Sequence, residues 1–231
     1  MLYTRQQVAD NLRNRDGKRV FYLKKEDILT NDARDWLNSQ KIEILPAEQA
    51  KKLSYRLLSG AEISEKPEYM THLNGEVLVP KTHPRIRFRG AVDNLEAAIL
   101  LCQIAVPQQK KPLQEILELA RRLIRCDVLE EPVEEFTLCG LTEQEQRRHS
   151  HFPQDHYGIP HFMPDSSDSA AVLELNRVRG IVRSTELVAM DAFCDRDGVP
   201  TRPDILKALN RMSSMVYILM LREKAKAIHG E

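Results

Sequence analysis

Residues 202–221, RPDILKALNRMSSMVYILML, decide the fold. Their apolar side chains step by four, three, four and three, which is the spacing of a stripe along an α-helix. The stripe consists of Ile205, Leu209, Met212, Val216 and Leu219. A polar line of Asn210, Ser213 and Tyr217 runs beside it. Since buried polar groups cost free energy without partners, this line indicates a polar crevice or, alternatively, hydrogen bonding between helices.

Other segments show helical spacing too. A second stripe consists of Val92, Leu95, Ile99, Cys102 and Val106. We expect another helix to open at Pro112, since proline suits a first turn, and a third to cover about residues 169–194. A shorter helix is expected from Thr142, where Thr-Glu-Gln-Glu can form a capping box. Such stripes pack at small angles, so the sequence predicts a mainly α fold, a (five-)helix bundle.

The N-terminal part has a different pattern. Helical signals over residues 4–12 and 31–40 alternate with extended ones over 19–23 and 41–45. We therefore expect a small α/β appendage over residues 1–45. Residues 46–70 are polar and weakly patterned, which predicts a short helix and a linker, and the bundle should occupy residues 71–231.

The composition indicates an ordinary globular protein. Of 231 residues, 42% are hydrophobic and 29% charged, and the formal net charge is zero, so no global field favours nucleic acid or membrane. No basic leader or apolar run of about 18 residues is present. Four widely spaced cysteines fit a reduced, cytoplasmic protein. A DNA-binding role for the appendage is the weaker alternative, because its charges are mixed.

Residues 85–89 read RIRFR and alternate between arginine and apolar side chains. In an extended chain, Arg85, Arg87 and Arg89 would lie on one face. A guanidinium matches two phosphate oxygens, so this face, with Lys81 and Thr82 just before it, predicts a polyphosphate site. The alternative is a solvated edge strand whose charges prevent aggregation.

The third long helix also carries a polar line, which consists of Asn176, Arg179, Arg183 and Glu186. Steps of three, four and three place these residues on one helix face. Two arginines four residues apart could hold an anion between them, although a solvated face would also tolerate them. Asp93 and Glu96 are expected at the start of the first bundle helix, near the positive end of its dipole.

Three segments together resemble a known family. Residues 92–99 (VDNLEAAI), 179–186 (RGIVRSTE) and 209–220 (LNRMSSMVYILM) resemble, in order, three signatures of PduO-type corrinoid adenosyltransferases. The closer resemblance is to the ethanolamine-utilisation (EutT) type of that superfamily. It is carried by residues 71–74 (THLN), 81–93, 125–132 (RCDVLEEP) and 150–165, and by residues 29–44 in the appendage.

This resemblance implies an enzyme that binds ATP with Mg²⁺ between bundle subunits and a corrinoid in a neighbouring pocket. Co(I) would attack the 5′ carbon of ATP, giving adenosylcobalamin and tripolyphosphate. Since cobalt is the nucleophile, positioning and electrostatics would carry the catalysis. A carrier or sensor without turnover is the alternative. The resemblance further implies a homo-oligomer, with a trimer favoured, and possible association with ethanolamine ammonia-lyase or a bacterial microcompartment. Nucleic acid and membrane are not expected as partners.

The resemblance also assigns roles to residues. The catalytic candidates are Asp93, Arg183 and Asn210. The ATP-binding candidates are Lys81, Thr82, Arg85, Arg87, Arg89, Arg179, Arg183, Glu186, Asn210 and Arg211. The corrinoid-binding candidates are Phe152, Tyr157 and Phe162. The chain lacks the superfamily's usual Gly- and Thr-rich phosphate loop, and Leu187 stands where many PduO-type sequences have an arginine.

No protein-bound transition metal is expected. Some EutT-type sequences carry a histidine and a cysteine cluster between the appendage and the bundle, but residues 58–73 contain no cysteine ligand. Four histidines crowd one later segment: His149, His151, His156 and His161. Their spacing fits no strong metal pattern, so we expect this segment to line the corrinoid pocket.

Overall fold

The structure, a computed structural model, describes residues 1–15, 18–49 and 55–230. The chain divides into two compact units. The first unit consists of Met1–Tyr55 and Glu62–Glu65, and the second of Arg56–Ala61 and Lys66–Glu231. The domain limits expected at residues 45 and 70 stay a prediction. Among the described residues, no helix is both long and apolar enough to span a membrane.

The N-terminal unit has a core of its own. Two helices, α1 (Arg5–Asp10) and α2 (Asn31–Ser39), begin after threonine caps whose hydroxyls accept backbone N–H groups. Strand β3 (Lys18–Leu23) pairs in parallel with β5 (Glu43–Pro46) and antiparallel with β2 (Arg13–Arg15). The short strands β1 (Leu2–Tyr3) and β4 (Ile28–Leu29) pair in parallel. The core consists of Val8, Phe21, Leu29, Ala33, Leu37 and Ile42.

The region predicted as a linker contains strands. After the short helix η1 (Ala47–Gln49) come β6 (Tyr55–Leu57) and β7 (Glu62–Ile63). Strand β9 (Val77–Pro80) pairs in parallel with β6 and antiparallel with β8 (Met70–Asn74). Strands of two or three residues are too short to produce a periodic pattern, which is why the sequence did not reveal them. Residues 50–54 of the predicted linker lie outside the described residues.

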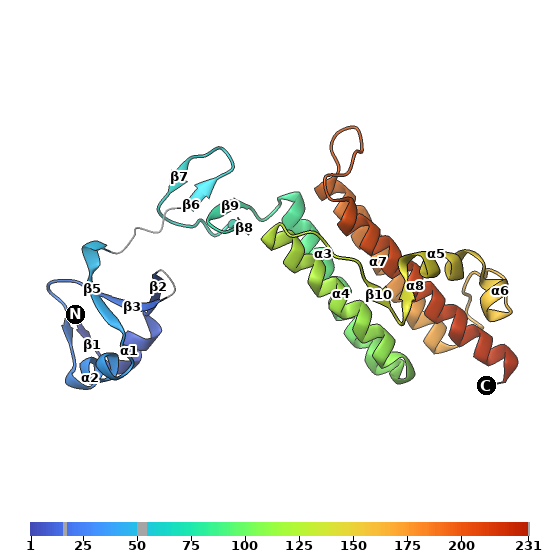
Figure 1. Ribbon diagram of the computed structural model, residues 1–231, viewed down its shortest axis with the longest axis horizontal. Coiled ribbons are helices and arrows are strands. Elements are labelled where there is room, and N and C mark those ends of the chain that lie inside the picture. Colours follow the sequence, from blue (N-terminus) through green and yellow to red (C-terminus); the bar gives the residue numbers. More distant parts are fainter. Residues whose placement is uncertain (16–17, 50–54, 231) are drawn as a thin grey trace. The chain divides into compact units, whose positions relative to one another are not determined.

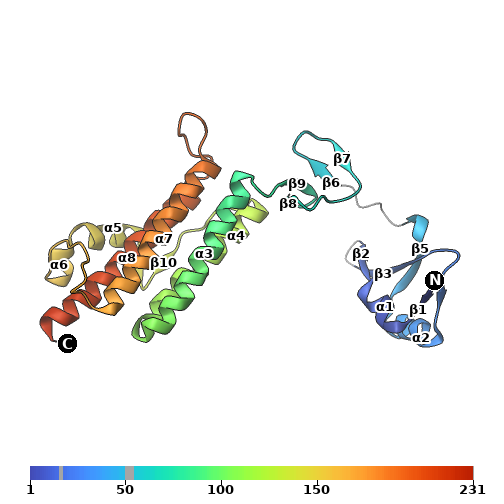
Figure 2. The ribbon, with the colours of Figure 1, turned by 180° about the vertical axis from the view of Figure 1, so that it is seen from behind.

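Four long helices lie side by side in the second unit (Figures 1 and 2). They are α3 (Pro84–Ala105), α4 (Lys110–Leu129), α7 (Ala170–Phe193) and α8 (Pro203–His229). Helix α3 contacts both α4 and α7, and α7 packs along α8. Every residue of the two predicted stripes, on α3 and α8, is at most 1% exposed. The mainly α prediction is therefore confirmed.

Smaller elements cover α8. Between α4 and α7 lie the hairpin of β10 (Thr137–Leu138) and β11 (Leu141–Thr142), then α5 (Glu143–His151) and α6 (Pro153–Tyr157). Both α5 and α6 contact α8. The predicted capping box at Thr142 is confirmed, because its hydroxyl accepts the Glu145 N–H and the Glu145 carboxylate accepts the Thr142 N–H.

The predicted start of the second bundle helix is wrong by two residues. After the short helix η2 (Pro107–Gln109), α4 begins at Lys110, and Pro112 is its third residue. The first four N–H groups of a helix have no partner within it, so a proline at this position removes no helical hydrogen bond.

The extended segment predicted at residues 85–89 is also wrong, because these residues form the first turns of α3. His83 caps the helix by accepting the Arg85 N–H, and Pro84 occupies its first position. The apolar stripe of α3 in fact reaches back to Phe88, four residues before Val92, and Phe88 is fully buried. That four-residue step is the helical signal that the arginine alternation concealed.

Because α3 begins this early, two of the arginines lie on one helical face rather than three on one strand face. Arg85 and Arg89 donate from Nε to the two carboxylate oxygens of Asp127, at 2.7 and 2.6 Å. Asp127 is fully buried near the end of α4. Asp93 and Glu96, expected at the start of the first helix, instead lie more than two turns inside it, away from the positive end of its dipole.

Candidate functional site

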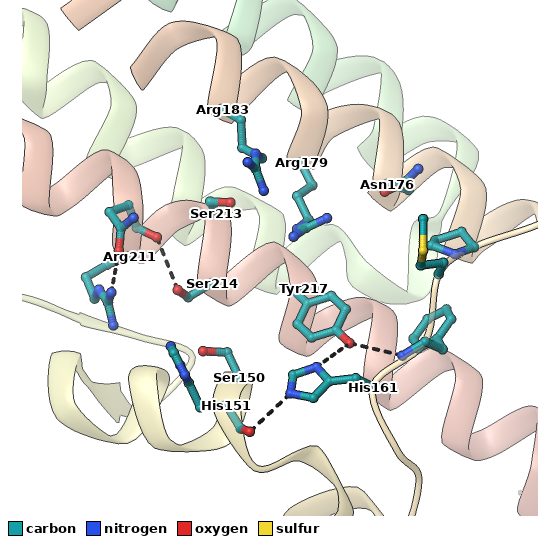
Figure 3. A pocket seen from close by; sticks show the side chains of 14 residues that line it. Ser150, His151, His161, Asn176, Arg179, Arg183, Arg211, Ser213, Ser214 and Tyr217 are labelled. Carbon is teal, nitrogen blue, oxygen red and sulfur yellow. Dashed lines mark hydrogen bonds between the residues drawn. The ribbon is translucent and has the colours of Figure 1, made fainter. Parts of the chain in front are cut away.

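A cavity of about 730 Å³ opens between α5, α7, α8 and residues 161–164 (Figure 3). Both polar lines predicted from the sequence face it, with the exception of Glu186. Helix α7 contributes Asn176, Arg179 and Arg183, and α8 contributes Asn210, Arg211, Ser213, Ser214 and Tyr217. The remaining lining residues are Ser150, His151, His161, Phe162, Met163 and Pro164. Cationic and amide groups thus occupy the α7 and α8 side, and apolar groups the residues 162–164 side.

Two unpaired cations point into this cavity. Arg179 and Arg183 project from one face of α7 (Figure 3), and neither forms an ion pair with any carboxylate in the part of the chain that the structure describes. The Arg179 Nε is buried and has no hydrogen-bond partner among the described residues. Burial, followed by the charge of Arg183, lowers the pKa of the Arg179 guanidinium. A buried donor without a partner costs free energy, so this geometry favours an anionic ligand.

The guanidinium of Arg179 packs against the ring of Tyr217. The guanidinium carbon lies 5.1 Å from the centroid of the Tyr217 ring, within the range of a cation–π contact. This contact fixes the position of the guanidinium in the lining of the cavity without neutralising its charge. The charge therefore stays available to a ligand.

Asn210 is held from two sides. Its Nδ2 donates to the Glu186 carboxylate at 3.2 Å, and Arg211 donates to its Oδ1. The Glu186 contact joins α7 to α8, so the alternative of hydrogen bonding between helices holds for this member of the polar line. Burial, followed by the charge of Arg147, lowers the pKa of Arg211. Glu186 orients the side-chain amide of Asn210 but is not itself among the residues that line the cavity.

The other candidates for ATP binding and catalysis are not brought into this cavity within one chain. Lys81 and Thr82, in the turn before α3, are exposed, and so are Arg87 in the first turn of α3 and Asp93 further along it. Arg85 and Arg89 carry the hydrogen bonds to Asp127 described above.

The three corrinoid-binding candidates are dispersed. Phe162 lines the main cavity, whereas Tyr157 lines a separate one of about 310 Å³ beside Arg222 and His229. Phe152 is 58% exposed and lines neither. Their arrangement therefore singles out Phe162 as the aromatic residue that a ligand in the main cavity would meet.

The histidine-rich segment makes internal contacts. The rings of His149 and His156 stack with centroids 3.7 Å apart, and His149 Nδ1 lies 2.8 Å from the Tyr157 hydroxyl. Burial, followed by the neighbouring His156, lowers the pKa of His149. His151 and His161 line the main cavity. Within the described ranges, no group of three or more histidine, cysteine or acidic side chains could hold a metal ion.

Sequence reasoning did not single out several lining residues. Ser150, Met163 and Pro164 lie within residues 150–165, which carry part of the resemblance, but no periodicity marked them individually, because they lie near a helix end or in irregular chain. His161 was expected only as part of a segment near a corrinoid. Its contact with Tyr217, 56 residues later, is a tertiary contact that spacing could not reveal.

The family model described as cobalamin adenosyltransferase matches residues 63–223. The chain belongs to this family. Its matched segment contains every residue that lines the main cavity. The chain is also 36% identical over 165 residues to the corrinoid adenosyltransferases EutT of Salmonella typhimurium strain LT2 and Escherichia coli strain K12.

The matched segment covers 71% of this chain but only 62% of either relative, so the chain spans less than two thirds of the EutT proteins it matches. No solved structure matches it significantly.

Proposed function

We propose that this cobalamin adenosyltransferase family member transfers the adenosyl group of ATP to cob(I)alamin. The observation that carries the proposal is the pair of uncompensated guanidiniums, Arg179 and Arg183, in a cavity with one apolar wall. ATP needs cations for its triphosphate, and a corrinoid needs a largely apolar surface. The family match and the EutT relatives support the same reaction.

In the proposed reaction, the electron pair of Co(I) forms a bond to the 5′ carbon of the ribose. The bond from that carbon to the triphosphate oxygen breaks, and tripolyphosphate leaves with its electrons. Adenosylcobalamin is the organic product. No side chain has to act as nucleophile, so the protein's contribution is to fix the reacting atoms in line and to stabilise the leaving charge.

Individual residues then take distinct roles. Arg179 and Arg183 bind the phosphates, and their charge stabilises the leaving tripolyphosphate. Asn210, oriented by Glu186, donates or accepts one hydrogen bond at a fixed position on the substrate. Magnesium accompanies ATP and neutralises part of the phosphate charge. Phe162 contributes to the apolar wall that faces the corrinoid.

Residues 81–93 are proposed to complete the site from a neighbouring copy of the chain, with a trimer favoured. Two observations support this proposal. Lys81, Arg87 and Asp93 are exposed and lie outside the cavity of their own chain. Further along α3, three apolar side chains are exposed by 43, 60 and 79%: Leu100, Leu101 and Ile104. An apolar face of this kind on a helix is typical of an interface.

We further propose that the product supplies ethanolamine ammonia-lyase in the cytoplasm, in association with a microcompartment. The N-terminal unit has a separate core and lies mostly outside the family match, so it is our candidate for such an attachment. The comparisons give no support to the alternative of a carrier without turnover.

The test is an anaerobic assay with ATP, magnesium and chemically reduced cob(I)alamin. We expect adenosylcobalamin to form, as measured by its absorption spectrum. One equivalent of tripolyphosphate should be released. A reaction without ATP gives the background rate. Binding of both ligands without any adenosylcobalamin would refute the proposal and favour the carrier.

A further inference from the structure

One wall of the main cavity is a short segment, residues 158–164, which we call the strap. It has no regular structure over residues 159–164, and its last four residues line the cavity. Tyr217 of α8 makes two hydrogen-bonding contacts with the strap. The Tyr217 hydroxyl lies 3.1 Å from His161 Nδ1 and accepts the Phe162 N–H at 3.4 Å (Figure 3).

The tautomer of the neutral His161 ring follows from its second hydrogen-bond partner. His161 Nε2 lies 3.1 Å from the backbone carbonyl oxygen of His151. A carbonyl only accepts, so Nε2 carries the proton, and in the neutral ring Nδ1 must accept from the Tyr217 O–H. A directed chain of hydrogen bonds therefore runs from Tyr217 through His161 to the end of α5.

Further contacts fix the same strap. Ile159 is 4% exposed and belongs to the bundle core. The Phe162 ring lies 6.1 Å from the Tyr217 ring and 5.4 Å from the Lys224 ammonium. Tyr217 and Lys224 are seven residues apart, so they lie on one face of α8. The strap is thus held along two turns of that helix.

Tyr217 touches both walls of the cavity. Its hydroxyl holds the strap, whereas its ring lies beneath the guanidinium of Arg179. We propose that Tyr217 is a positioning residue that sets the distance between the apolar strap and the phosphate-binding arginines. This inference rests on the proposed function, in which a corrinoid lies against the strap and the triphosphate lies against Arg179.

The two contacts of Tyr217 can be separated by mutation. Tyr217→Phe removes the hydroxyl but keeps the ring under Arg179. The strap should loosen while the phosphate side stays intact. The KM for cob(I)alamin should then rise about three- to tenfold, the order expected when the hydroxyl's bonds to His161 and Phe162 are lost, with the KM for ATP nearly unchanged. A general loss of folding would instead lower the apparent kcat, because fewer molecules are active, and would leave both KM values unchanged.

His161 offers a conservative rescue. Glutamine also presents one acceptor and one donor at its tip, so His161→Gln should keep most of the corrinoid affinity. His161→Ala should also raise the KM for cob(I)alamin, although the Phe162 N–H can still reach the Tyr217 hydroxyl. The effect of the double variant Tyr217→Phe/His161→Ala should fall short of the sum of the two single effects, because both changes break the contact between Tyr217 and His161. Tyr69→Phe, the same chemical change at a 69% exposed tyrosine, is the matched control.

Hydrogen–deuterium exchange tests the strap without any substrate. In Tyr217→Phe, the peptide containing the Phe162 amide should exchange on the order of tenfold faster, whereas peptides from α7 should not change. Unchanged exchange would overturn the inference. Faster exchange with an unchanged KM for cob(I)alamin would also overturn it, since the strap would then not contact the corrinoid. If the wild-type protein made no adenosylcobalamin, the proposed function would fail while the exchange result still reported on the strap.

Discussion

Asp127→Asn should destabilise the helical unit strongly. The Asp127 carboxylate is fully buried and receives hydrogen bonds from both Arg85 and Arg89. These arginine side chains are only 18 and 16% exposed. Asparagine has nearly the same size, so the substitution removes the charge without opening a cavity. Arg85 would then keep only the exposed carboxylate of Glu130, 3.4 Å from its Nη1, and Arg89 would keep no counter-charge among the described residues.

The size of the effect can be estimated from the contacts. Breaking a buried ion pair costs about 3–5 kcal/mol. Each guanidinium keeps a backbone acceptor, the carbonyl of Asp127 or of Leu73, both at 2.6 Å. These bonds offset part of the cost, so we expect a loss of roughly 3 kcal/mol. For a unit of this size, that loss lowers Tm by roughly 6–12 °C.

Urea unfolding followed by circular dichroism at 222 nm measures the loss. The single tryptophan, Trp36, packs in the N-terminal unit, so its fluorescence reports on that unit separately and should not shift. Glu96→Gln is the control, because it breaks a pair whose partner, Arg121, is 53% exposed, and should cost less than about 1 kcal/mol. A loss below about 1 kcal/mol in Asp127→Asn would refute the assigned role of this triad.

Three further predictions concern other parts of the bundle. Thr142→Ala removes the capping box of α5 and should lower stability by about 1 kcal/mol in urea unfolding. Burial raises the pKa of Asp204, but hydrogen bonds led by that from Arg202 outweigh it and hold the pKa at about 2. Because this lies below the unfolded value of about 3.9, Asp204→Asn should cost roughly 2 kcal/mol at pH 7, and the difference should shrink as the pH falls toward 2. Ile104→Glu should shift the protein to a smaller species in size-exclusion chromatography without loss of helicity; an unchanged elution volume would argue against the α3 interface.

The apolar periodicity predicted the bundle because each stripe reports directly on burial. Residues of the α8 stripe, such as Leu209 and Val216, are fully buried as expected. The start of α3 was predicted wrongly because arginines alternating with Ile86 and Phe88 satisfy a strand period as well as a helical one. The deciding partner, Asp127, lies 42 residues from Arg85, and local patterning carries no information about such a contact.

The candidate site was predictable where it lies on helices. The spacing of Arg179 and Arg183 places them on one face of α7, and the structure directs that face toward Asn210 and Tyr217 of α8. The strap was not predictable, because irregular chain has no period and its position depends on contacts with α8. The proposed contribution of Asp93 from a second copy likewise depends on assembly rather than on local sequence.

The most direct test of the account is the rate of adenosylcobalamin formation by Arg183→Ala. Its kcat/KM should fall at least about 100-fold, the order found when one charge-stabilising donor is removed, with the circular dichroism spectrum unchanged. Arg121→Ala removes an exposed arginine that does not line the cavity, so this variant should keep near-normal activity. A near-normal rate in Arg183→Ala would contradict the central claim that the triphosphate binds between α7 and α8.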